Sequence, residues 1–272
     1  MKKITFNMKL LPFKYLILFT LILLISCNRE KSEPFSFVQM CDTQLGMGGY
    51  IHDVQTFKQA VKQINKIDPD FVVLCGDLVN HANDSSFRAF NLIREGFSMP
   101  SYCAPGNHDI GNSPNDSSLE RYRTSIGRDY FNFQHKGYSF LVCNTQLWKV
   151  DCGEESENHN RWFLETLKET ASENHPVFVV GHYPLYLEEP DEDVNYFNLP
   201  LNKRMELLGL FEQQNIVAYL SGHTHKTIIN NYHGIQLVNG ETTSKNFDEA
   251  PMGFRIWTVS TDSIWHRFLA LE

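Results

Sequence analysis

The sequence has few cysteines, and they are not arranged in a way that would build a scaffold. Six cysteines are spread over 272 residues, and no two are spaced as CxxC. Cys41, Cys75, Cys103 and Cys143 each lie in an apolar, strand-like segment, where a thiol packs as a small hydrophobic group. Disulfide-rich domains and thiolate zinc modules are therefore excluded.

The chain also lacks an internal repeat, a low-complexity segment and, beyond its first residues, a basic run. Its formal net charge is -8, and residues 1–26 contain four lysines and no acidic residue, so the remainder carries -12. An acidic surface without basic clusters repels long nucleic acid, and no nucleic-acid partner is expected. A small phosphate ester is compatible with this charge, because bound cations reverse the local field.

Residues 1–26 are typical of a secretory signal. Lysines precede an apolar stretch at 15–25, which at ~1.5 Å per residue is too short for the ~30 Å core of a membrane. The sequence LISC at 24–27 resembles the lipobox of bacterial lipoproteins, and this resemblance implies cleavage before Cys27 and attachment of lipid to it. We expect a lipoprotein signal peptide over 1–26, with an uncleaved N-terminal anchor as the alternative.

Residues 27–34 are polar and lack periodicity, which is typical of a tether. Together with the signal, they predict an exported protein anchored through lipidated Cys27 to a membrane of the bacterial cell envelope. Residues 35–272 are long enough for one domain with a sizeable core. No oligomeric state follows from the sequence.

The domain alternates between strand-like and helical segments. Residues 71–75 form a short apolar run, as in a strand buried on both faces, whereas Val54, Phe57 and Val61 mark one stripe of a helix. After residue 227 the pattern becomes strand only. Alternation followed by strands predicts two packed sheets with helices outside, and functional sites in such sheets lie beyond the carboxyl ends of strands.

Side chains of metal-binding type follow five of the predicted strands. The blocks are Asp42-Thr43-Gln44, Gly76-Asp77, Gly106-Asn107-His108-Asp109, Gly181-His182 and Gly222-His223-Thr224-His225. One such residue alone is ordinary turn chemistry. Five strand ends in succession that carry carboxylate, amide or imidazole groups instead indicate a shared metal site, and these donors suit manganese, iron and zinc.

In this order and spacing, the blocks resemble the calcineurin-like metallophosphoesterase superfamily over residues 35–272. The resemblance implies an α/β fold, a four-layer α/β/β/α sandwich of two mixed sheets with a metal site at the carboxyl ends of its strands. It also implies that Asp77 bridges two divalent metal ions (Mn, Fe or Zn). By the same resemblance, Asp42, Gln44 and His225 complete one site, and Asn107, His182 and His223 complete the other.

The resemblance further implies that His108, steered by Asp109, lies beside the substrate phosphate while a metal-activated hydroxide attacks phosphorus. Many members have His where this chain has Gln44. The Asp-x-Gln pattern resembles a subgroup of serine/threonine phosphatases with a calcineurin-like phosphoesterase domain. Because a neutral amide is a weaker donor than imidazole towards transition metals, we expect the Gln44 site to hold its cation less tightly.

The predicted function is hydrolysis of phosphate monoesters, either small phosphate esters or phosphoproteins. A phosphodiesterase for cyclic nucleotides or glycerophosphodiesters is one alternative, and a metal-stabilised surface binding protein that has lost activity is another. Two features have two interpretations each. Segment 185–200, with Tyr186, Tyr196 and Phe197, forms a wall of the substrate cleft or a solvated acidic loop, and His81 touches substrate or is a surface histidine.

Overall fold

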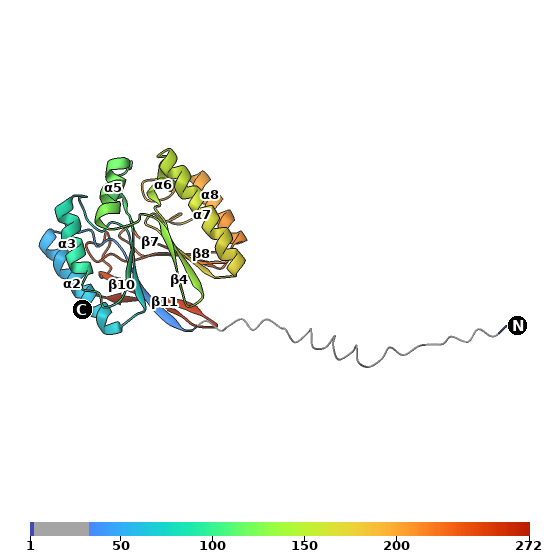
Figure 1. Ribbon diagram of the computed structural model, residues 1–272. Coiled ribbons are helices and arrows are strands. Elements are labelled where there is room, and N and C mark those ends of the chain that lie inside the picture. The colour runs from blue at the N-terminus through green and yellow to red at the C-terminus, as the bar shows by residue number, and fades with distance from the viewer. Residues whose placement is uncertain (3–32) are drawn as a thin grey trace. The chain divides into compact units, whose positions relative to one another are not determined.

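Two mixed β-sheets packed face to face form the centre of the molecule (Figure 1). The computed structural model describes residues 1–2 and 33–272, and residues 33–272 form one compact unit. Residues 3–26 of the predicted signal peptide, Cys27 and most of the predicted tether therefore lie outside the described residues. No helix in the described part of the chain is long and apolar enough to cross a membrane.

The elements follow the predicted alternation. The five-stranded sheet, in the order β11-β10-β1-β2-β3, consists of β1 (Phe35–Met40), β2 (Phe71–Cys75), β3 (Ser101–Ala104), β10 (Gly253–Val259) and β11 (Ile264–Ala270). The six-stranded sheet, in the order β4-β5-β6-β7-β9-β8, consists of β4 (Phe131–His135), β5 (Tyr138–Val142), β6 (Val177–Val180), β7 (Ile216–Ser221), β8 (Ile228–Tyr232) and β9 (Ile235–Asn239). The helices are α2 (Tyr50–Ile67), α3 (Asp84–Arg94), α4 (Asn107–Ile110), α5 (Asp116–Ser125), α6 (Gln146–Lys149), α7 (Glu154–Glu173) and α8 (Leu201–Gln213).

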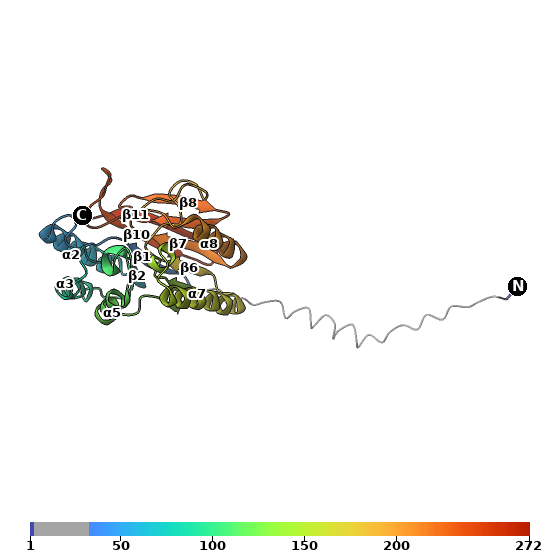
Figure 2. The ribbon, with the colours of Figure 1, turned by 90° about the horizontal axis from the view of Figure 1, so that it is seen from above.

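Helices cover the outer face of each sheet (Figure 2). Successive side chains of a strand point to opposite faces. In β2, Phe71 and Val73 therefore pack against the six-stranded sheet, and Val72 and Leu74 pack against α2 and α3. Helices α7 and α8 cover the six-stranded sheet through a separate cluster. These three apolar clusters separate four layers, and the predicted α/β/β/α sandwich is confirmed.

The direction of the strands gathers the loops of interest at one edge. Strands β1, β2 and β3 are parallel neighbours in one sheet, and β6 and β7 are parallel neighbours in the other. The carboxyl ends of parallel strands meet at the same edge of a sheet. The five cysteines of the described residues are all free, in agreement with the absence of a disulfide scaffold.

Candidate metal centre

The seven predicted metal ligands follow the carboxyl ends of these five strands, six of them in loops and Asn107 at the start of α4. In chain order they are Asp42 and Gln44 after β1, Asp77 after β2, Asn107 after β3, His182 after β6, and His223 and His225 after β7. All seven are buried. Segments that are as far apart as β1 and β7 in the sequence thus contribute side chains to one place.

The carboxylate of Asp77 lies between two groups of donor atoms. It forms one group with two imidazoles and another with a carboxylate and an imidazole, and the atoms within each group lie within 4.8 Å of one another. With the neighbouring amides included, the histidine half consists of Asp77, Asn107, His182 and His223, and the glutamine half consists of Asp42, Gln44, Asp77 and His225. A carboxylate shared in this way is suited to bridging two cations.

The histidine half has the closer contacts. Nε2 of His182 lies 3.1 Å from Oδ1 of Asn107, 3.1 Å from Nδ1 of His223 and 3.4 Å from Oδ1 of Asp77. In the glutamine half, Nε2 of His225 lies 3.7 Å from Oδ1 of Asp42.

Gln44 leaves an acceptor without a donor. Its Nε2 donates to Oδ1 of Asn80 at 3.4 Å, and its Oε1 is buried without a hydrogen-bond partner among the described residues. Burying an acceptor in this state costs about 1–3 kcal/mol. A bound cation would satisfy this oxygen, so the residue fits a ligand role.

Backbone carbonyls orient the three imidazoles of the centre. The pairs are Nδ1 of His182 with the carbonyl of Cys75, Nε2 of His223 with that of Tyr196, and Nδ1 of His225 with that of Lys245. A carbonyl oxygen only accepts, so the nitrogen facing it carries the hydrogen and the other nitrogen presents a lone pair to the centre. In the histidine half, the two imidazole nitrogens converge with Oδ1 of Asn107 and Oδ1 of Asp77, and a bound cation would satisfy these four atoms together.

The charges of the histidine half also shift the pKa values of its own side chains. Burial alone would raise the pKa of the Asp77 carboxyl, but the neighbouring His182 holds it well below its usual range. Burial alone would lower the pKa of His182, and the Asp77 carboxylate raises it to about 9 instead. Burial, together with His182, holds the pKa of His223 well below its ordinary value. A site that attracts a proton this strongly also fits a divalent cation, which competes with the proton for the same nitrogen.

The backbone at the ligands is strained. Asp42, Gln44, Asp77, His223 and His225 all adopt a left-handed conformation, with φ of 48°, 32°, 49°, 75° and 53°. Residues with a Cβ avoid this region, and each such residue costs about 1–3 kcal/mol. The strain is concentrated at the predicted ligands.

Two glycines permit close approach around the carboxylates. A Cβ on Gly106 would lie 2.1 Å from Oδ1 of Asp77, and a Cβ on Gly222 would lie 2.5 Å from Oδ2 of Asp42. The glycines of these blocks are therefore more than turn formers.

Asp109 supports the loop of Asp77. Its fully buried carboxylate accepts hydrogen bonds from the backbone amides of Leu78, Val79 and Gly106 at 2.8–3.1 Å. The prediction that Asp109 steers His108 is therefore wrong. Consecutive residues of a helix do not face each other, and both lie in the short helix α4.

His108 is held from other directions. Its backbone amide donates to Oδ1 of Asp77 at 2.8 Å, and its Nδ1 donates to the carbonyl of Asn80 at 3.0 Å. Its Nε2 has no hydrogen-bond partner among residues 33–272, and the side chain lines a cavity of 610 Å³. The structure thus places His108 at the edge of the centre with one nitrogen available to a substrate.

The same cavity includes Asn107, Tyr196 and the exposed His81. Tyr196 belongs to segment 185–200, which contains no helix or strand. Of the two interpretations of this segment, the wall of a cleft agrees with the structure. The sequence did not indicate that Tyr196 is the tyrosine of this segment that faces the cavity, because an irregular segment has no periodicity.

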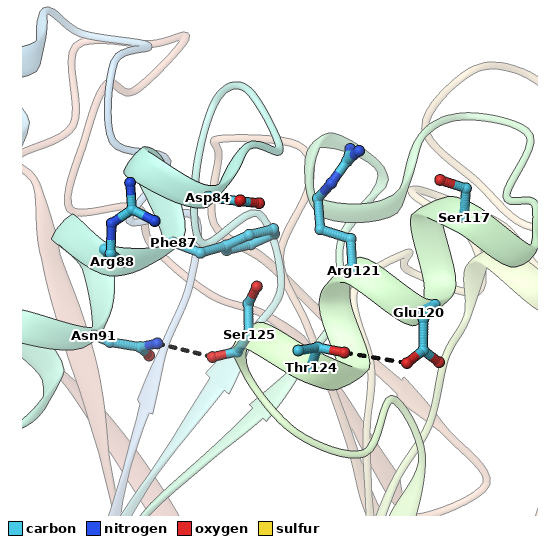
Figure 3. A pocket seen from close by; sticks show the side chains of 9 residues that line it. All are labelled: Asp84, Phe87, Arg88, Asn91, Ser117, Glu120, Arg121, Thr124 and Ser125. Atoms are coloured by element: carbon cyan, nitrogen blue, oxygen red, sulfur yellow. Dashed lines mark hydrogen bonds between the residues drawn. The ribbon is translucent and has the colours of Figure 1, made fainter.

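A second cavity of 510 Å³ lies between α3 and α5 (Figure 3). Arg88 and Arg121 rise on its two sides, and Asn91 donates to the carbonyl of Ser125 at 2.8 Å across it. It contains none of the predicted metal ligands, so it is not the candidate site. Arg121 lines both cavities, which makes them neighbours.

Comparison with known proteins assigns the chain to the family that its sequence motifs resemble. Residues 35–227 match the family described as calcineurin-like phosphoesterase. The chain is similar to serine/threonine-protein phosphatase CPPED1 of Danio rerio, with 33% identity over 272 residues that cover 90% of this chain and 87% of that protein. It is also similar to 3',5'-cyclic adenosine monophosphate phosphodiesterase CpdA of Haemophilus influenzae, with 26% identity over 220 residues that cover 79% and 76%.

The fold is shared with a dimetal phosphatase from Danio rerio. That structure has a TM-score of 0.69 at 14% sequence identity and covers 88% of this chain and 96% of its own. The fold, the buried donor groups around Asp77 and the match over most of the chain agree with one another. The chain belongs to the calcineurin-like phosphoesterase family, and it is a hydrolase of phosphate esters.

Proposed function

We propose that the protein hydrolyses phosphate monoesters at the centre around Asp77. The observation that supports this most directly is the position of Asp77 in two buried groups of metal-ligand atoms, one of which also includes Oδ1 of Asn107 at 3.1 Å from Nε2 of His182. Small phosphate esters and phosphoproteins are the substrate classes. The relative named as a protein phosphatase shares more identity and more of the chain with this protein than the relative named as a phosphodiesterase.

The cofactors in this proposal are two manganese, iron or zinc ions, because oxygen and imidazole donors without thiolates suit these metals. When bound, such ions neutralise phosphate oxygens and make water more acidic. The chain itself orients the donors through backbone carbonyls and keeps water from their outer sides by burial. In the protonated form of His108, Nδ1 keeps its hydrogen bond to the carbonyl of Asn80 and Nε2 also carries a hydrogen, which it is placed to donate to the leaving oxygen of the ester.

Elemental analysis and a substrate panel test this function together. We expect purified protein to contain divalent metal and to hydrolyse an aryl phosphate monoester at least about tenfold faster than a bis-aryl diester. Faster turnover of the diester would favour the phosphodiesterase alternative. A folded, metal-loaded protein that is inactive on every ester would favour a surface binding protein that has lost activity.

The proposal includes export and a lipid anchor on Cys27, which would place the domain on a membrane of the bacterial cell envelope. The support is the LISC sequence at 24–27 after a basic and an apolar segment. Mass spectrometry of protein from membranes should detect acylated Cys27 at the mature N-terminus. Cys27→Ser should move the protein out of the membrane fraction, and an unmodified, uncleaved N-terminus in the parent would contradict the anchor.

A further inference from the structure

Segment 185–200 carries a polar network that fixes its shape. The carboxylate of Glu192 accepts hydrogen bonds from the backbone amides of Leu187, Glu188 and Glu189 at 2.8–3.2 Å and from Nδ2 of Asn198 at 2.6 Å. Charge-assisted hydrogen bonds of this kind are stronger than neutral ones. The acidic loop is therefore folded around one of its own carboxylates.

Two cations of the chain anchor the segment from outside. The fully buried Arg204 of α8 donates to the carbonyls of Pro190 and Leu199 at 2.9 Å and 3.1 Å. Lys149 at the end of α6 donates to the carbonyl of Asn195 at 2.7 Å. Tyr196 thus follows directly after a residue whose backbone is held in place.

Tyr196 lies against the metal centre. Its ring centroid is 5.0 Å from that of His223, and its carbonyl accepts from Nε2 of the same histidine at 3.4 Å. The side chain is 51% exposed and lines the cavity that also contains His108.

The hydroxyl of Tyr196 has a proton left to donate. It lies 3.2 Å from Nδ2 of Asn107, and because an amide NH2 group only donates, the phenol oxygen is the acceptor in this contact. No acceptor for the phenolic hydrogen is found among the described residues. The O–H is therefore available to a ligand in the cavity.

We propose that Tyr196 binds substrate by donating this hydrogen to a non-bridging phosphate oxygen, and that it thereby favours monoesters over diesters. The inference rests on the proposed phosphoesterase function. A monoester has one more non-bridging oxygen, and more negative charge, than a diester. If the two halves of the centre each engage one such oxygen, only a monoester retains another for a donor outside the centre.

The test compares Tyr196→Phe with Tyr186→Phe in metal-loaded protein. Tyr196→Phe keeps the ring beside His223 and removes only the hydroxyl, whereas the buried Tyr186 belongs to the core under α8 and serves as the matched control. We expect kcat/KM for an aryl monoester and the affinity for inorganic phosphate, measured by calorimetry, to fall about tenfold or more in Tyr196→Phe. Diester turnover, metal content and the unfolding midpoint should stay at parent values, and Tyr186→Phe should match the parent throughout.

Three outcomes would overturn the inference. The first is unchanged phosphate affinity and unchanged monoester turnover in Tyr196→Phe. The second is an equal loss of turnover for monoester and diester. The third is loss of metal from Tyr196→Phe, which would mean that the hydroxyl supports Asn107 rather than substrate. If the parent itself hydrolyses no ester, the proposed function fails instead. Phosphate affinity then still decides whether Tyr196 binds the anion.

Discussion

The two halves of the metal centre share Asp77 but differ in what surrounds it. The histidine half offers two imidazoles and an amide, with contacts of 3.1–3.4 Å around His182. The glutamine half offers one imidazole and the amide of Gln44, and its contact between His225 and Asp42 is 3.7 Å. The same fold has thus placed one nitrogen-rich and one oxygen-rich site side by side.

This difference predicts unequal binding. Imidazole suits zinc, copper, iron and nickel, whereas oxygen donors suit manganese, magnesium and calcium. We expect the histidine half to hold its cation more tightly and the glutamine half to exchange its cation more readily.

Removing the shared carboxylate of Asp77 should abolish metal binding in both halves. In Asp77→Asn a neutral amide replaces the bridging anion, so both halves lose their common ligand. We expect loss of both cations and a fall in kcat/KM on the order of 10³-fold or more, since the missing cations supply several kcal/mol of transition-state stabilisation. Elemental analysis and steady-state kinetics measure this. The control is Asp84→Asn, a change of an exposed residue at the start of α3. Retention of both cations in Asp77→Asn would contradict the proposal that Asp77 bridges them.

Changing His108 should remove chemistry and leave both halves intact. His108 lines the cavity but belongs to neither donor group. We expect His108→Gln to lower kcat by about 10²–10⁴-fold, the usual contribution of a general acid, with both metal affinities unchanged. The neighbouring cavity residue His81 provides His81→Gln as the control, which should stay near the parent. If His108→Gln lost metal, His108 would have to be counted among the ligands.

Gln44→His should reduce the difference between the halves. It replaces the neutral amide by imidazole, and the affinity of the glutamine half should rise by about tenfold or more, the scale of effects seen around metal ligands. Manganese titration of metal-free protein should show two unequal affinities in the parent and a narrower gap in the variant. Equal affinities in the parent would refute the idea that Gln44 weakens its half.

A buried imidazole that belongs to neither half of the centre provides a further comparison. His159 is fully buried among Tyr130, Trp148 and Trp162, and neither of its ring nitrogens has a hydrogen-bond partner among the described residues. The histidines of the centre, by contrast, each donate to a backbone carbonyl. His159 is a structural residue, held by ring packing alone.

The last expected effect leaves the metal centre untouched and concerns stability against pH. Burial, with Lys203 nearby, lowers the pKa of His159 to about 3. The unfolded chain takes up the proton near pH 6.5, so the folded state loses about 1.4 kcal/mol per pH unit below that value until the folded pKa is reached. His159→Phe removes this loss, and its advantage over the parent should grow by about 2 kcal/mol between pH 7 and pH 5 in urea unfolding. The same difference at both pH values would contradict this assignment.

Much of the molecule was predictable because strand ends are visible in the sequence. Apolar runs such as 71–75 located buried strands, and the polar residue after each run located a loop at the sheet edge. The resemblance of these blocks to a known family then implied that Asp77 bridges two metal ions. The start of helix α7 at Glu154 is not marked in this way, because its first turns are acidic and favour a helix N-terminus without marking a buried face.

Other features could not be predicted because they depend on three-dimensional contacts. The family resemblance implied that Asp109 steers His108, but the helical turn directs the carboxylate to the amides beside Asp77 instead. The sequence does not show that the carbonyl of Asn80 orients His108, since every residue has a backbone carbonyl. Tyr196 was one of several aromatic residues in an irregular segment, and only its contact with Asn107 singles it out.

The left-handed backbone at five predicted ligands affects how such a centre changes by mutation during evolution. Glycine adopts this conformation without penalty, so a mutation from Asp42 or His225 to glycine would relieve strain even as it removes a donor. The predicted ligand positions are therefore among those where a change to glycine relieves backbone strain while it removes the activity. Descendants that no longer need the reaction should lose these side chains early and keep the sandwich intact.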